Sequence, residues 1–153
     1  MKNILEEIAA RTRERIAKEK TCISVSELEN RIQEVNKNAG KRITFLQALQ
    51  KDGMSYICEV KKASPSKGLI APDFPYLAIA KEYEQAGASA ISCLTEPFYF
   101  QGADQYLREI AATVQIPVLR KDFTVDEYMI YQAKSLGASA VLLICAILDD
   151  GEL

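Results

Sequence analysis

The sequence predicts an α/β fold, the N-terminal half of a (β/α)8 barrel with its strands one to four, behind a helical N-terminal extension. Three observations indicate it: short apolar β-branched segments alternate with helical patterns from Met54 onward, a small motif repeats, and residues 1–52 contain no good strand. Such alternation specifies parallel strands joined by right-handed crossovers. We therefore divide the chain into a helical extension, residues 1–52, and a strand–helix unit, residues 53–153.

The extension is predicted to hold two long helices. Residues 3–19 place apolar side chains at near-helical spacing among charged ones, the pattern of an amphipathic surface helix. A second helix is expected over residues 26–37, with Ser24 or Ser26 as its N-cap, because either hydroxyl can accept a hydrogen bond from the first turn. Gly40 is expected to end that segment.

A short third helix precedes the strand–helix alternation. Thr44 is placed to cap a helix that runs from Phe45 through Leu49. Beyond it, four segments are short, apolar and β-branched, as expected of strands covered on both faces: 55–61, 89–94, 117–121 and 140–145. Helical patterns follow the first three of these strands, at about 75–86, 104–114 and 125–136.

An internal repeat supports this organisation. The motif Gly-Ala-Ser-Ala at residues 87–90 recurs at 137–140, each time between the end of a helix and the start of a strand. Glycine at a helix C-terminus supplies a left-handed cap, and the small residues after it let the strand begin close to the helix. The arrangement is common in (β/α)8 barrels and also occurs in doubly wound sheets. A barrel needs roughly 250 residues, so this chain carries about half of one.

Composition excludes several classes of function. The 19 Lys and Arg residues against 21 Asp and Glu residues give a net charge of −2, which argues against nucleic acid or an anionic membrane as the main partner. The chain contains no His, which removes serine triads, Cys-His dyads and most zinc sites. Proton transfer must therefore use Lys, Glu, Asp, Tyr or Cys side chains.

The cysteines and the N-terminal segment predict a reducing compartment. Four cysteines lie far apart without a CxxC pair, a pattern that favours buried reduced thiols over a disulfide or a metal site: Cys22, Cys58, Cys93 and Cys145. Residues 1–20 are charged throughout, unlike a signal peptide. No run approaches the roughly 20 apolar residues of a membrane span. We expect a cytoplasmic protein.

Candidate chemistry begins on the first predicted strand. Because side chains alternate along a strand, Glu59 and Lys61 share one face while Cys58 and Val60 share the other. If Cys58 and Val60 face the helices, the carboxylate of Glu59 and the ammonium group of Lys61 point into the barrel at the C-terminal end of the strand. Interior charges at that end usually belong to an active site. The alternative is that Lys61 and Lys62 lie just past the strand in solvent.

Lys121 occupies the matching place at the end of the third predicted strand, where Asp122 follows it. Two lysines at the ends of strands one and three would face each other across the mouth of a barrel. A lysine in that position can act as a general acid or hold an anionic substrate.

Four residue strings mark these strand ends. They are Glu-Val-Lys-Lys-Ala-Ser-Pro-Ser-Lys-Gly at 59–68, Leu-Thr-Glu-Pro-Phe-Tyr-Phe-Gln-Gly at 94–102, Leu-Arg-Lys-Asp-Phe at 119–123 and Gly-Ala-Ser-Ala-Val-Leu-Leu-Ile at 137–144. These strings resemble the indole-3-glycerol-phosphate synthase family of tryptophan biosynthesis, and the ten-residue string of the first strand is hard to meet by chance. The helical extension is similar too, so the resemblance covers the whole chain.

The resemblance implies a TIM barrel and a carbon–carbon lyase. The family closes the ring of 1-(2-carboxyphenylamino)-1-deoxyribulose 5-phosphate, with loss of carbon dioxide and water, to give indole-3-glycerol phosphate. A phosphorylated small-molecule substrate is therefore implied. No metal and no organic cofactor are implied.

The resemblance also assigns roles to individual residues. Lys121 would be the general acid that protonates the substrate carbonyl, Lys61 would neutralise the substrate carboxylate, and Glu59 would orient the lysines and the substrate hydroxyls. The other implied site residues would bind substrate, one at the phosphate and four as walls of the aromatic ring: Ser64, and Leu94, Phe100, Phe123 and Leu142.

Four of the five substrate-binding assignments have a structural alternative. Leu94 and Leu142 would be core residues in any barrel of this kind. The aromatic run at 98–100 can pack over a core edge, although its place above the second strand favours a substrate lid. Ser64 and Pro65 can form nothing more than a turn, since both residue types favour one.

The resemblance stops with the chain at Leu153, where the fourth helix should begin. Strands five to eight carry the family's second acid-base glutamate, a polarising asparagine and most of the phosphate-binding backbone. We therefore expect a fragment that is inactive alone and that self-associates through exposed half-barrel edges. A non-catalytic half-barrel that serves as an assembly unit is the alternative. Another phosphate-handling barrel, such as an isomerase, would not explain the first-strand string.

Overall fold

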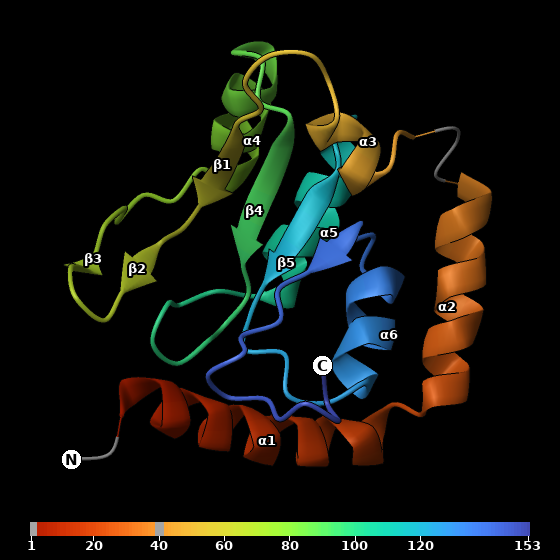
Figure 1. Cartoon of the computed structure of the whole chain (residues 1–153), viewed down its shortest axis with the longest axis vertical. Helices are drawn as coiled ribbons and strands as arrows, with labels where there is room; N and C mark the ends of the chain where they lie inside the picture. Colours follow the sequence, from red (N-terminus) through yellow and green to blue (C-terminus); the bar gives the residue numbers. More distant parts are fainter. Residues whose placement is uncertain (1–2, 39–41) are drawn as a thin grey trace.

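The computed structural model describes residues 3–38 and 42–153, and it contains a parallel sheet with helices packed against one face (Figure 1). The helices are α1 (Ile4–Cys22), α2 (Val25–Asn38), α3 (Phe45–Leu49), α4 (Tyr76–Gln85), α5 (Asp104–Thr113) and α6 (Tyr128–Ser135). The strands are β1 (Ile57–Val60), β2 (Ala63–Ser64), β3 (Gly68–Leu69), β4 (Ala90–Leu94), β5 (Val118–Lys121) and β6 (Ala140–Val141).

The main sheet has the strand order β1-β4-β5-β6, and every neighbouring pair is parallel. Helices α4, α5 and α6 connect these strands in sequence, so each crossover leads to the adjacent strand. This order is that of a partial (β/α) barrel, as the sequence predicts. Within the described ranges, no helix is both long and apolar enough to cross a membrane.

The repeated motif works as a helix stop and strand start in both copies. Gly87 and Gly137 both have φ of 92°, the left-handed conformation that glycine adopts without strain. Two residues later the backbone N–H of Ser89 donates to the carbonyl of Tyr56, and that of Ser139 donates to Val118, both at 2.8 Å. Each copy therefore sets its strand directly beside the previous one.

The strands are shorter than predicted, and one small hairpin was not predicted. β1 covers 57–60 rather than 55–61, and β6 covers only 140–141 rather than 140–145. Among the described residues β6 pairs on one side only, with β5. The register sets Lys121, the last residue of β5, opposite Leu142, so residues beyond 142 have no strand residue opposite them. The antiparallel pair β2–β3 turns through residues 65–67, and its two-residue strands are too short to produce a sequence pattern.

The helical extension follows the prediction closely. Among the two candidate caps, Ser24 accepts the backbone N–H of Glu27 at 3.2 Å. Thr44 and Gln47 form a reciprocal capping box at the start of α3, because each side chain accepts the other's backbone N–H. The expected helix stop at Gly40 lies outside the described residues.

Two apolar clusters hold the fold together. The larger one lies between the sheet and helices α4 to α6 and includes Val60, Ile91, Leu107, Ile110 and Val118, all at most 2% exposed. The second joins α1, α2 and α6 through residues that include Ile16, Leu28, Tyr128 and Met129. The helical extension is therefore packed onto the strand–helix unit through its own core.

The prediction of buried thiols is only partly correct. All four cysteines are free, and Cys93 is buried, where loss of hydration raises the pKa of its thiol to about 12. Cys58 is half-buried, but Cys22 and Cys145 are exposed. Cys22 is the last residue of α1, and Cys145 lies beyond the short β6, so neither is inside a covered strand.

A buried guanidinium joins the elements at the C-terminal end of β5. Arg120 is 0% exposed and donates hydrogen bonds to Thr95 at 3.1 Å, Asp104 at 2.9 Å and Gln132 at 2.8 Å, with Asp122 at 3.4 Å. Its partners lie after β4, at the start of α5, in α6 and after β5. Burial of such a charge is tolerated because the donors of the guanidinium are well satisfied.

We expect Arg120→Met to lower the free energy of unfolding of the chain by about 3–5 kcal/mol, because it leaves buried acceptors without their donor. Urea denaturation followed by circular dichroism measures this loss. Arg31→Met is the matched control, since Arg31 pairs with Glu27 on the surface and such pairs contribute about 0–1 kcal/mol. Equal losses in the two variants would contradict the prediction.

Candidate active site

The three residues expected to be catalytic lie together at the C-terminal ends of β1 and β5. Lys61 donates to Oε1 of Glu59 at 2.5 Å, and Lys121 donates to Oε2 of the same carboxylate at 2.9 Å. Their side chains are 28–37% exposed, so the cluster is half-buried and open to solvent. The two lysines share Glu59 between them rather than facing each other directly.

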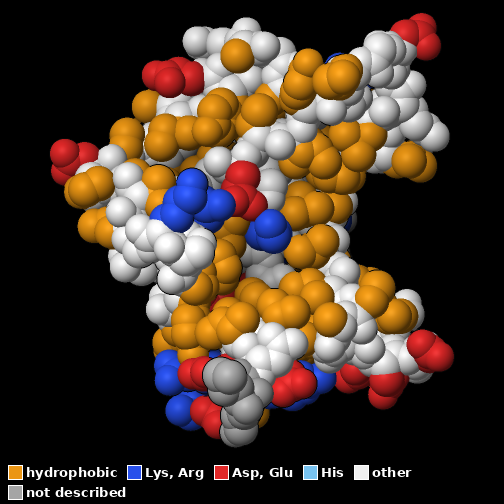
Figure 2. Space-filling model, turned by 60° about the vertical axis from the view of Figure 1, so that its left-hand side comes forward, with side chains coloured by type: hydrophobic (Ala, Val, Ile, Leu, Met, Phe, Trp, Pro, Cys, Tyr) orange, Lys and Arg blue, Asp and Glu red, His pale blue; other side chains and the backbone are white. Residues whose placement is uncertain are grey.

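Strand alternation explains why these side chains meet. Val60 is 1% exposed and belongs to the core against the helices, so Glu59 and Lys61 project from the opposite, open face. Parallel pairing of β4 with β5 sets Lys121 beside Leu94, at the same edge of the sheet. Figure 2 shows basic and acidic side chains meeting at the centre of a hollowed face, with hydrophobic side chains above and below.

The carboxyl group of Glu59 is held in its ionised form. Burial by itself raises the pKa of Glu59, but hydrogen bonds and charge from Lys61 and Lys121 outweigh it, and the net pKa lies below the usual value. A carboxylate that stays ionised at neutral pH keeps two ammonium groups aligned at the open face. The arrangement can donate a proton and bind an anion at the same place.

Aromatic and apolar side chains line the same edge. The rings of Phe100 and Phe123 lie 6.4 Å apart, and Phe123 follows Lys121 by two residues. Phe123 is 7% exposed and Leu94 is 4% exposed, so both also serve as core residues. Leu142 follows directly after β6, three strands away from β1 in the sheet order, and is half-buried.

Ser64 lies in the β2–β3 hairpin rather than in the main sheet. It is 8% exposed, and its hydroxyl accepts the backbone N–H of Lys67 at 3.2 Å. The turn expected as the structural alternative is therefore present. The same hydroxyl still has a proton to donate.

The sequence did not predict that α1 lies across this edge of the sheet, where Figure 1 shows it below the strand ends. Three of its side chains reach loops that follow strands: Glu7 accepts from the hydroxyl of Tyr99, Arg15 binds Asp122 at 3.1 Å, and Lys20 binds Asp126 at 2.6 Å. The only signal was the run of charges along the helix, which does not reveal its partners.

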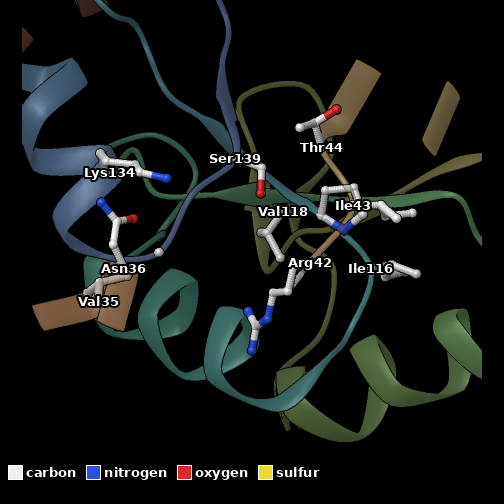
Figure 3. A pocket seen from close by; sticks show the side chains of 11 residues that line it. Val35, Asn36, Arg42, Ile43, Thr44, Ile116, Val118, Lys134 and Ser139 are labelled. Atoms are coloured by element: carbon white, nitrogen blue, oxygen red, sulfur yellow. The ribbon is translucent and has the colours of Figure 1, made fainter. Parts of the chain in front are cut away.

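A second hollow lies at the opposite end of the sheet, close to the start of β5 (Figure 3). It has a volume of about 260 Å³ and includes Arg42 and Lys134. Both cations have a structural reason to be there, since Arg42 donates to the carbonyl of Ala111 in α5 and Lys134 lies in the last turn of α6. The Glu59 cluster is therefore the better candidate for chemistry.

Comparison with known proteins identifies the family. The family model described as indole-3-glycerol phosphate synthase matches residues 5–153. The chain belongs to this family. An indole-3-glycerol phosphate synthase of Ruminiclostridium cellulolyticum is 54% identical over 147 residues, which cover 95% of this chain and 55% of that protein. One from Lacticaseibacillus paracasei is 52% identical over 150 residues, covering 98% of this chain and 57% of that protein.

The match fits the fold described above. The chain spans little more than half the length of the curated relatives it matches, and it contains four parallel strands in barrel order. It therefore corresponds to the N-terminal half of an indole-3-glycerol phosphate synthase.

The lowered pKa of Glu59 predicts a pH-dependent contribution to stability. Because the folded pKa lies below the ordinary value of 4.5, this contribution is present above pH 4.5 and is lost as the pH falls through the folded pKa. The difference in unfolding free energy between the wild-type chain and Glu59→Gln should therefore shrink from pH 7 to pH 3. Urea titrations at both pH values measure this difference in unfolding free energy. A difference that grows on acidification would contradict a lowered pKa of Glu59 in the folded chain.

Proposed function

We propose that this chain supplies the N-terminal half of the active site that makes indole-3-glycerol phosphate in tryptophan biosynthesis. The reaction closes the ring of 1-(2-carboxyphenylamino)-1-deoxyribulose 5-phosphate with loss of carbon dioxide and water. The observation that carries the proposal is the pair of lysines held on one carboxylate, Glu59, at the open edge of the sheet. Family membership gives that cluster its substrate class.

The proposed roles follow from the chemistry of the steps. As the aromatic carbon attacks the substrate carbonyl, negative charge develops on the carbonyl oxygen, and Lys121 donates a proton to it as general acid. Lys61 neutralises the substrate carboxylate until carbon dioxide leaves. Glu59 orients both ammonium groups and the substrate hydroxyls, which is consistent with its hydrogen bonds to both lysines.

The proposed substrate contacts surround this cluster. Phe100, Phe123, Leu94 and Leu142 wall the aromatic ring, and the 6.4 Å separation of the two phenylalanine rings supports a shared apolar surface. The Ser64 hydroxyl donates a hydrogen bond to the substrate phosphate while it continues to accept the backbone N–H of Lys67. No metal and no organic cofactor take part in the proposed reaction, and its site is cytoplasmic.

The proposal assigns only part of the catalytic machinery to residues 1–153. The curated relatives are nearly twice as long, and a barrel places phosphate sites near strands seven and eight. We therefore expect this chain alone to show no synthase turnover and to bind the substrate phosphate weakly.

Self-association is a second candidate property, and the exposed edge of the sheet favours it. The outer edge of β1 pairs with no strand among the described residues, and Tyr56 and Ile57 beside it are 58% and 47% exposed. Unpaired strand edges with exposed apolar side chains pair with other chains. A non-catalytic assembly unit would use this edge.

In a chimera of residues 1–153 with the remaining C-terminal part of the Ruminiclostridium cellulolyticum synthase, Lys121→Ala should reduce kcat by roughly 10²- to 10⁴-fold, because one positioned general acid is lost. Formation of indole-3-glycerol phosphate is followed by its absorbance. Lys81→Ala, on the exposed surface of α4, is the control and should retain full turnover. Near-normal turnover of Lys121→Ala would remove that residue from the proposed role.

The isolated 153-residue chain should form dimers or larger assemblies at micromolar concentration, because an open strand edge gains hydrogen bonds and buries apolar surface on pairing. Sedimentation velocity measures the assembly size. Ile57→Lys places a charge on the exposed edge and should shift the chain toward monomer. A compact wild-type monomer across this concentration range would count against the proposal.

A further inference from the structure

The loop that follows β4 is built around one buried carboxylate. Glu96 accepts the backbone N–H of Phe98 at 2.9 Å through Oε1, and those of Tyr99 at 2.7 Å and Phe100 at 3.0 Å through Oε2. Three consecutive aromatic residues therefore donate to the same side chain. This interaction fixes the backbone of the segment that carries their rings.

The environment of Glu96 is unusual for an acidic residue. It is 0% exposed, and no Lys or Arg of the described residues lies within ion-pair distance of it. Backbone N–H groups alone stabilise the carboxylate, and such charge-assisted hydrogen bonds are stronger than neutral ones. An isolated buried charge would be costly without them.

The rest of the loop leaves little freedom around this centre. The N–H of Gly102 donates to the carbonyl of Glu96 at 2.8 Å, and a Cβ at position 102 would come within 2.6 Å of the Leu94 carbonyl oxygen. Gln101 has a positive φ of 50°, and Arg120 binds Thr95 and Asp104 on the two sides of the loop. These contacts fix the two ends of the loop, so the hydrogen bonds of Glu96 determine the backbone conformation of the middle part, residues 98–100.

The aromatic rings leave this frame in different directions. Phe98 is 54% exposed, Tyr99 donates to Glu7 of α1, and Phe100 is half-buried against Phe123. Of the three rings, it is that of Phe100 that lies beside an aromatic ring of the candidate active site, Phe123.

We propose that Glu96 is a positioning residue that holds Phe100 against Phe123, so that the two rings form one wall for the aromatic ring of the substrate. This role rests on the proposed synthase function. Glu96 itself touches no reacting atom, and it acts through three backbone N–H groups. Loss of the carboxylate should weaken substrate binding more than it slows the chemical steps.

The first test is amide hydrogen exchange on the 153-residue chain. In Glu96→Gln one oxygen becomes an NH2 group that cannot accept, so the amides of residues 98–100 should exchange about tenfold faster or more. Glu84→Gln is the matched control, because Glu84 also accepts two backbone N–H groups, those of Gln115 and Ile116, at the other end of the sheet. Unchanged exchange at 98–100 in Glu96→Gln overturns the proposal. If that variant does not fold, Glu96→Asp, which keeps the charge with a shorter reach, replaces it.

The second test separates positioning from general structural damage in the chimera described above. Glu96→Gln should raise KM by about tenfold with kcat little changed, as a lost binding wall does. In a Phe100→Ala background the same change should have little further effect, because the ring it positions is gone. An equal effect in both backgrounds, or a fall in kcat alone, overturns the proposal. An unmodified chimera without turnover would defeat the synthase function instead, and the exchange experiment would still decide whether Glu96 organises the loop.

Discussion

The buried pair Arg120–Asp122 is the interaction on which the rest of the structure depends. Both side chains are 0% exposed, and between them they bind groups in α1, α5 and α6 and the residue that follows β4. Lys121 lies between these two residues in the sequence. Since side chains alternate, a network that anchors residues 120 and 122 on the covered side turns the intervening lysine toward the open face.

The two faces of the sheet have different roles. One face is covered by helices and carries apolar residues with Arg120 at the end of β5, whereas the other carries Glu59, Lys61 and Lys121 at the edge formed by the C-terminal strand ends. The half-buried charges of the cluster are stabilised because the Glu59 carboxylate accepts hydrogen bonds from two ammonium groups. The fold thus places titratable groups where a substrate can reach them and keeps the apolar core on the other face.

Much of this could be predicted from local patterns. Strand alternation was sufficient to bring Glu59 and Lys61 to one face, the Gly-Ala-Ser-Ala repeat marked the helix stops, and Thr44 marked a cap. The apolar sequence at 140–145 predicts a longer strand than β6 forms, because the length of β6 depends on how far β5 extends beside it. The contacts of α1 could not be predicted, because a charged helix face fits many partners.

The long-range contacts of α1 also bear on how the chain folds. Neighbouring strands pair residues only about 30 positions apart, as in Ile57 with Ala90, whereas the Arg15–Asp122 bond spans 107 positions. Contacts of high sequence separation form late, because closing a long segment costs entropy before any contact rewards it. At a synthesis rate of about 5–20 residues per second, Arg15 is made on the order of 5–20 s before Asp122. The dense surface charge of α1 then keeps this segment soluble until the residues that it binds, such as Asp122, have been synthesised.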